Sequence, residues 1–79
     1  MRHFLYIDSE TRLEFSSRAK AFIYADKNNI TSIVLTVYDK TMSVSHQYTV
    51  FNPYLVGCGC VEYFKTENQA LKHIASFLN

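Results

Sequence analysis

The sequence has no tryptophan, a single proline, two glycines and two cysteines. So little glycine and proline exclude a collagen-like or low-complexity chain, because such chains need both in quantity. Two cysteines are too few for the disulfide framework of a small secreted protein. No apolar run approaches the about 18 residues of a membrane-spanning helix. The N-terminal stretch MRHFLYIDSE is interrupted too early for a signal peptide. We therefore expect a cytoplasmic protein with reduced cysteines and no membrane partner.

An excess of charge of either sign is also missing. Eight basic and seven acidic residues give a formal net charge of +1. Nucleic-acid-binding domains usually carry a basic patch or stripe, whereas only Lys20 and Lys27 share one side of an expected helix. Binding to DNA or RNA is therefore the less favoured alternative.

What the chain does have is apolar and aromatic content: 48% of its 79 residues are hydrophobic, and six Tyr and six Phe are among them. This composition predicts a folded domain rather than a disordered chain. At this length the expectation is one domain over residues 1–79 with a thin core, since a 60-residue domain buries only about 60% of its unfolded surface.

The first third of the chain predicts two strands and a helix. Residues 2–8 (RHFLYID) are rich in aromatic and β-branched residues, residues 8–11 have turn chemistry, and residues 12–15 (RLEF) form a short second strand. Residues 16–29 (SSRAKAFIYADKNN) predict a helix. Ser16 or Ser17 is its N-cap, and Asn28 or Asn29 ends it in the left-handed conformation.

This helix has apolar residues on two sides. The side with core spacing is formed by Ala19, Phe22 and Ile23. The opposite side is formed by Ala21, Tyr24 and Ala25. Two interpretations of the second side remain open: it is either a tolerated scatter of exposed residues or a contact surface formed by Tyr24 and its alanine neighbours.

Residues 30–51 predict a β-hairpin packed on one face. Ile33, Leu35 and Val37 alternate with other residues in the first strand, and the second strand has a strict period of two from Met42 to Val50. A two-residue turn at Asp39-Lys40 would pair the strands as Tyr38 with Thr41, Val37 with Met42, and Leu35 with Val44. A longer loop would keep the same topology. The polar face of the second strand should meet water and is formed by Ser43, Ser45, Gln47 and Thr49.

Residues 53–64 (PYLVGCGCVEYF) hold the proline, both glycines and both cysteines. We interpret Val56 to Phe64 as a strand that Gly57 and Gly59 bend where another element approaches closely, with the cysteines as small core residues. The Cys-x-Cys spacing does not match the usual zinc-ligand pairs. A Cys–His nucleophile pair of Cys60 with His46 has no orienting partner, so we expect no metal, cofactor or catalytic site.

Residues 66–79 predict a C-terminal helix that begins with a capping box of Thr66 and Gln69. Its apolar residues lie on one arc and are Ala70, Leu71, Ile74, Ala75, Phe77 and Leu78.

The predicted fold is α+β: a small antiparallel sheet of 3–5 strands with two helices packed on one face, in the order β(β)αβββα. Because no reaction-bearing motif is present, we expect a non-catalytic protein-binding protein, an adaptor or inhibitor of a larger partner. This size class is typical of phage or mobile-element accessories such as anti-defence inhibitors. A nucleic-acid-binding module using sheet aromatics and a small thiol or metal enzyme are the alternatives. We also expect a homodimer. The interface candidates are Lys20, Tyr24, Lys27, Tyr38, Lys40 and Tyr54.

Overall fold

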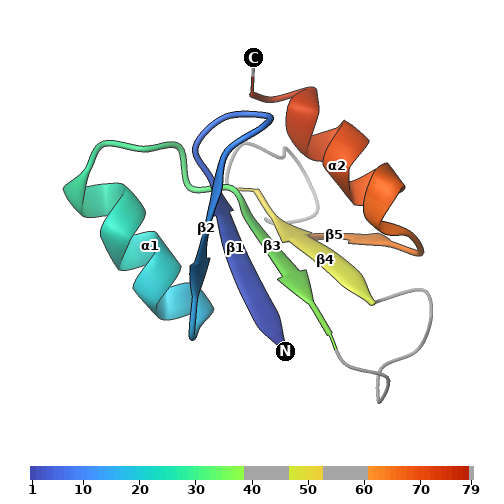
Figure 1. Cartoon of the computed structure of the whole chain (residues 1–79), viewed down its shortest axis with the longest axis horizontal. Helices are drawn as coiled ribbons and strands as arrows, with labels where there is room; N and C mark the ends of the chain where they lie inside the picture. The colour runs from blue at the N-terminus through green and yellow to red at the C-terminus, as the bar shows by residue number, and fades with distance from the viewer. Residues whose placement is uncertain (39–46, 53–60, 79) are drawn as a thin grey trace.

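A computed structural model describes residues 1–38, 47–52 and 61–78 of the chain. Within these ranges, strands and helices follow the order β1 (Arg2–Tyr6), β2 (Arg12–Phe15), α1 (Arg18–Lys27), β3 (Val34–Val37), β4 (Tyr48–Phe51), β5 (Val61–Phe64) and α2 (Glu67–Ala75). All neighbouring strands pair antiparallel, in the spatial order β2-β1-β3-β4-β5 (Figure 1). The predicted α+β class and element order are confirmed.

The turn between β1 and β2 is held by one carboxylate. The Asp8 side chain accepts hydrogen bonds from the backbone N–H groups of Glu10 and Thr11, both at 2.8 Å. The backbone N–H of Ile7 donates to the carbonyl oxygen of Thr11 at 2.9 Å, which closes the turn. These backbone donors lower the pKa of Asp8, because they stabilise the ionised carboxylate. The turn predicted for residues 8–11 is confirmed.

Helix α1 begins and ends as the sequence predicts, and α2 begins as predicted but ends at Ala75, earlier than the expected helix over residues 66–79. Ser17 caps α1 by accepting the backbone N–H of Lys20 at 3.2 Å, and Asn29 follows α1 with a left-handed φ of 54°. Thr66 caps α2 by accepting the backbone N–H of Gln69 at 3.3 Å. The Gln69 side chain reaches back to the backbone N–H of Lys65, so the box closes one residue earlier than the standard arrangement.

The two helices cover opposite faces of the sheet, which corrects the expectation that both lie on one face. Helix α2 packs mainly on β4 and β5, whereas α1 packs on β1, β2 and β3. One core cluster combines α2 with alternate strand residues and consists of Phe4, Tyr6, Ile33, Leu35, Val50, Ala70, Ile74 and Leu78. The other combines α1 with the intervening strand residues and consists of Leu5, Ala21, Ala25 and Val34. Because β1 and β3 are apolar on both faces, each face needs its own cover.

The core face of α1 is also different from the predicted one. Ala21 and Ala25 are completely buried, while Ile23 is 61% exposed. At 100° per residue, the helix is turned by roughly a third of a turn from the expected orientation. Alanine has the smallest side chain that still suits a helix, so this face allows the helix axis to lie close to Leu5 and Val34.

The pairing of β3 with β4 differs from the predicted hairpin register. Val37 pairs with Tyr48 and Leu35 with Val50, so the partners lie six residues later than expected. A shift by an even number keeps each side chain on its predicted face. Thr49, however, is only 1% exposed, so this part of the strand's polar face does not meet water. The predicted turn at residues 39–40, and the predicted strand residues 41–46, lie outside the described residues.

The last strand and helix complete the sheet edge and the second core. Strand β5 covers the end of the predicted strand from Val56, and Gly57, Cys58, Gly59 and Cys60 lie outside the described residues. Three residues of the predicted arc in α2 and its C-terminal extension are buried, namely Ala70, Ile74 and Leu78. Ala75 and Phe77 are exposed.

Candidate functional site

The outward side of α1 is the most unusual surface of the described residues. We call it the α1 outer face and define it as Lys20, Ile23, Tyr24 and Lys27. Ile23 has 61% of its surface exposed and Tyr24 has 37%. Residues spaced three or four apart lie next to one another on a helix, so these four side chains form one continuous patch. An aliphatic and an aromatic side chain therefore lie between two ammonium groups.

The ring of Tyr24 is held in place from below. It packs against Phe15 of β2 with ring centroids 5.3 Å apart and an interplanar angle of 51°. Tilted aromatic pairs at this separation are favourable. The backbone carbonyl of Tyr24 also accepts a hydrogen bond from the side-chain amide of Asn28 at 2.9 Å. The Asn28 hydrogen bond thus fixes the end of α1, and the contact with Phe15 supports the Tyr24 ring on the α1 outer face.

A patch of this composition suits an apolar depression with an acidic rim. Exposed tyrosines are enriched at the cores of protein interfaces, and anchors of this kind contribute most when they enter a pocket that excludes water. Lys20 and Lys27 lie two helical turns apart, one at each end of the patch, and the patch itself contains no carboxylate. The arrangement can therefore orient a negatively charged partner surface around a central apolar contact.

The interface candidates from the sequence are only partly brought together. Lys20, Tyr24 and Lys27 share the α1 outer face. Tyr38 lies elsewhere: it directly follows β3, is half-buried, and its hydroxyl accepts a hydrogen bond from Arg18 Nη1 at 3.4 Å. Lys40 and Tyr54 lie outside the described residues.

Ile23 belongs to the α1 outer face but is not among the interface residues that the sequence predicts. The i, i+3, i+4 spacing of Ala19, Phe22 and Ile23 predicts that Ile23 faces the core, whereas the structure exposes it. Leu5 and Val34 alternate with other apolar residues in their strands, which indicates that both faces of the sheet are covered. A helix that covers the second face can use small residues to approach the sheet closely. Once Ala21 and Ala25 are placed in the core, Ile23 must point outward.

His3 and Thr36 form a buried polar pair beneath the start of α1. His3 Nδ1 is 2.9 Å from Thr36 Oγ1. Arg18 spans this region of the sheet, with its guanidinium carbon 4.1 Å from the centroid of the Phe51 ring. Burial lowers the pKa of His3, and the positive charges of Arg18 and of the N-terminal amine lower it further. Burial and the nearby positive charges thus disfavour the protonated form of His3, whose Nδ1 lies within hydrogen-bond distance of the buried Thr36 hydroxyl.

The metal and thiol hypotheses depend on Cys58 and Cys60, which lie outside the described residues. Among residues 1–38, 47–52 and 61–78, no three His, Cys, Asp or Glu side chains are grouped so that they could hold a metal ion. No helix in these ranges is long and apolar enough to span a membrane.

Comparison of the chain with family models, with curated proteins and with solved structures finds no match. The functional assignment therefore rests on the surface chemistry of this chain.

Proposed function

We propose that this protein is a small non-catalytic binding protein that docks on a larger protein partner through the α1 outer face. It acts as an adaptor or an inhibitor, as expected of a phage or mobile-element accessory. The observation that carries the proposal is the exposure of Ile23, which is 61% exposed although smaller alanines of the same helix are fully buried. The partner presents an apolar depression bordered by carboxylates, which would receive Ile23 and Tyr24 and pair with Lys20 and Lys27.

Site-specific crosslinking tests this proposal directly. A photo-reactive p-benzoylphenylalanine in place of Tyr24 should capture one discrete protein in cells that naturally contain the chain. The same amino acid in place of Phe77, which is 40% exposed on the opposite side of the sheet, is the matched control and should not capture that protein. Equal adducts from both positions, or none from position 24, would refute the proposed surface.

The nucleic-acid hypothesis is another outcome of the same experiment. Stacking of bases needs exposed sheet aromatics, and Tyr63, at 52%, is the one exposed aromatic among the described strand residues. An adduct at position 24 that nuclease treatment removes would replace the protein-binding proposal with nucleic-acid binding.

We also propose that the protein forms a homodimer, through a surface other than the α1 outer face. Two copies paired through their α1 outer faces would bring lysines together without a carboxylate on that face. Among the described strands, β5 (Val61–Phe64) is the last in the order of the sheet and carries one acidic residue, Glu62, and strands at the end of a sheet readily pair with a second copy. Sedimentation at high micromolar concentration should show a dimer, and a monomer would contradict this part.

The cytoplasm is the proposed compartment. The support is compositional: two cysteines in a Cys-x-Cys spacing do not suggest a disulfide framework, which small secreted proteins commonly use.

A further inference from the structure

Strand β2 forms one end of the sheet of described strands, and of these only β1 pairs with it. The backbone N–H of Ile7 donates to the carbonyl oxygen of Thr11, so these two residues continue the β1–β2 register as a hydrogen-bonded pair. Hydrogen-bonded and non-hydrogen-bonded pairs alternate along an antiparallel ladder. Leu13 therefore directs its backbone N–H and C=O groups to β1, whereas Arg12 and Glu14 direct theirs away from the sheet.

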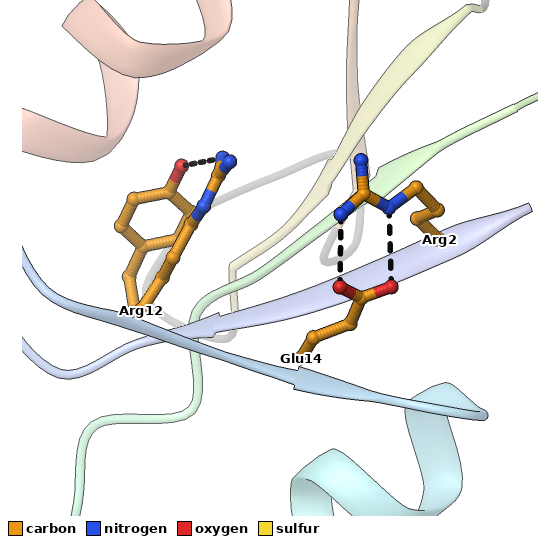
Figure 2. Close-up of polar contacts among 4 residues, drawn as sticks. Arg2, Arg12 and Glu14 are labelled. Atoms are coloured by element: carbon orange, nitrogen blue, oxygen red, sulfur yellow. Dashed lines mark hydrogen bonds and ion pairs between the residues drawn. The ribbon is translucent and has the colours of Figure 1, made fainter.

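The side-chain charges of these two outward residues are balanced differently (Figure 2). Glu14 forms a bidentate pair with Arg2, at 3.1 Å and 2.9 Å, which lowers the pKa of Glu14 and raises that of Arg2. Arg12 Nη1 donates to the Tyr6 hydroxyl at 3.1 Å. The guanidinium carbons of Arg12 and Arg2 lie 3.9 Å and 4.9 Å from the centroid of the Phe4 ring. Within the described ranges, no carboxylate lies within ion-pair distance of Arg12, so this oriented guanidinium keeps an unbalanced charge.

The side of α1 that lies over β2 continues this edge. The Tyr24 ring packs on the Phe15 ring of β2, with the two centroids 5.3 Å apart. Lys20 and Lys27 lie four and three residues from Tyr24 and are its neighbours on the helix. The β2 edge and the α1 outer face thus form one surface, with positive charges at Arg12, Lys20 and Lys27.

We propose that the partner of the α1 outer face adds an extended segment to β2 as a further strand, with a carboxylate opposite Arg12. The inference rests on the proposed function and names how that partner is held. The outward backbone groups of Arg12 and Glu14 supply main-chain hydrogen bonds, as in other binding by strand addition. Side chains alternate between the two faces of the added strand. The carboxylate therefore pairs with the guanidinium on one face, and the adjacent apolar side chain lies beside Leu13 on the other.

The positive charge of this surface favours a different protein over a second copy. In an antiparallel pair of β2 strands, a twofold axis perpendicular to the sheet would keep both α1 helices on the same side. Lys20 and Lys27 of the two copies would then approach each other, although the α1 outer face has no carboxylate. An acidic segment meets these lysines without repulsion. The homodimer proposed above uses β5 at the other end of the described sheet, so both contacts can form together.

Titration of the ¹⁵N-labelled full chain with the peptide acetyl-Ser-Thr-Val-Glu-Val-Thr-Ser-amide tests the added strand. When this peptide pairs antiparallel with β2, its glutamate lies opposite Arg12 and a valine lies opposite Leu13. We expect saturable shifts of the amide resonances, largest at Arg12 and Glu14. The same peptide N-methylated at the glutamate nitrogen loses a backbone donor and should cause much smaller shifts. No shifts at millimolar peptide, or equal shifts with both peptides, would overturn the proposal.

A peptide with glutamine in place of glutamate tests the carboxylate. It should bind roughly tenfold more weakly, as expected for loss of a charge-assisted hydrogen bond. Arg12→Gln should weaken binding of the glutamate peptide by a similar factor. Lys65→Gln removes a positive charge beside β5 and should leave the affinity unchanged. Equal affinities of the two peptides for the unaltered chain would overturn the choice of an acidic partner.

A proline at position 14 tests the outward backbone. Glu14→Pro removes an N–H that faces away from β1, a position where a strand tolerates proline. Glu14→Thr is the matched control, because it also loses the ion pair with Arg2 but keeps the N–H and suits a strand. Circular dichroism should show both variants folded. Binding of the peptide should be nearly unchanged in Glu14→Thr and at least about tenfold weaker in Glu14→Pro, and equal affinities would contradict strand addition.

The crosslinking experiment at position 24 separates this inference from the proposed function. If position 24 captures a different protein but the peptide does not bind β2, the docking surface stands and the added strand is wrong. If position 24 captures nothing, both are refuted. An adduct with twice the mass of the chain would assign the edge to a second copy and would overturn the inference.

Discussion

The two faces of the sheet are covered in different ways. On one face, α1 uses two alanines and approaches the sheet closely, so its larger apolar side chain, Ile23, points away from the core. On the other face, α2 inserts Ile74 into the core, Leu78 follows from the segment after the helix, and part of the sheet is left to arginine side chains. In α1, therefore, the space above the sheet decides which side of the helix is buried, and the size of the helical side chains does not.

Replacing an isoleucine by alanine in each helix should give the largest difference in stability, because one isoleucine is buried and the other is exposed. Ile74→Ala removes a side chain that is 1% exposed and should lower the free energy of unfolding by about 2–5 kcal/mol. Ile23→Ala removes an exposed one and should change it by less than about 0.5 kcal/mol. Urea unfolding followed by circular dichroism measures both. If Ile23→Ala cost as much as Ile74→Ala, the orientation of α1 would be wrong.

Enlarging an alanine tests the close approach of α1. Ala25→Leu inserts a larger side chain where none of the alanine surface is exposed, and overpacking should lower the free energy of unfolding by about 1–3 kcal/mol. Ala75→Leu makes the same change at an exposed position of α2 and should be nearly neutral. Thermal unfolding of the two variants compares them, and a neutral Ala25→Leu would contradict close packing on that face.

The buried histidine on the α1 side predicts a pH dependence. Because the pKa of His3 is lowered on folding, the unfolded chain takes up a proton as the pH falls below 6.5 while the folded chain does not. Stability should therefore fall between pH 6.5 and the lower folded pKa, by at most about 1.4 kcal/mol per pH unit. The pKa values of Glu14 and Asp8 are also lowered, but these carboxylates reduce stability only when the pH falls below their ordinary pKa values of 4.5 and 3.8.

A variant identifies the group responsible. His3→Asn places an amide where Nδ1 meets Thr36 and removes the titration, so this part of the pH dependence should disappear. Urea midpoints measured from pH 5 to pH 8 on both proteins provide the comparison. Persistence of the slope in His3→Asn would assign it to another group.

The arginines that cover the sheet on the α2 side should contribute less to the free energy of unfolding than the buried core residues. Arg12→Ala removes a cation–π contact with Phe4 and should lower the free energy of unfolding by about 0.5–1 kcal/mol. Lys20→Ala, an exposed residue of the α1 outer face, is the control and should be neutral. Chemical unfolding measures both, and equal effects would mean that the arginine does not cover the ring.

Local sequence signals predicted local structure well. The 8–11 turn, the Ser17 cap and the capping box at Thr66 follow from side chains that bond to nearby backbone, and the strand at residues 12–15 follows from the turn that returns the chain along β1. The pairing of β3 with β4 and the orientation of α1 did not follow, because both depend on contacts between segments far apart in the sequence. The continuous apolar runs of β1 and β3 were the available sign that both sheet faces are covered.

The candidate surface was predictable in part. Lys20, Tyr24 and Lys27 could be placed on one helix side from their spacing alone. Ile23 could not be added, because its exposure depends on which side of α1 meets the sheet.

Capture of the crosslinked partner by two charge-insertion variants tests the central claim most directly. Ile23→Asp and Phe77→Asp each place a carboxylate at an exposed apolar position, one on each helix-bearing side of the sheet. We expect the partner captured from position 24 to be lost with Ile23→Asp and retained with Phe77→Asp, while both variants stay folded. Retention by Ile23→Asp, or loss with Phe77→Asp alone, would contradict it.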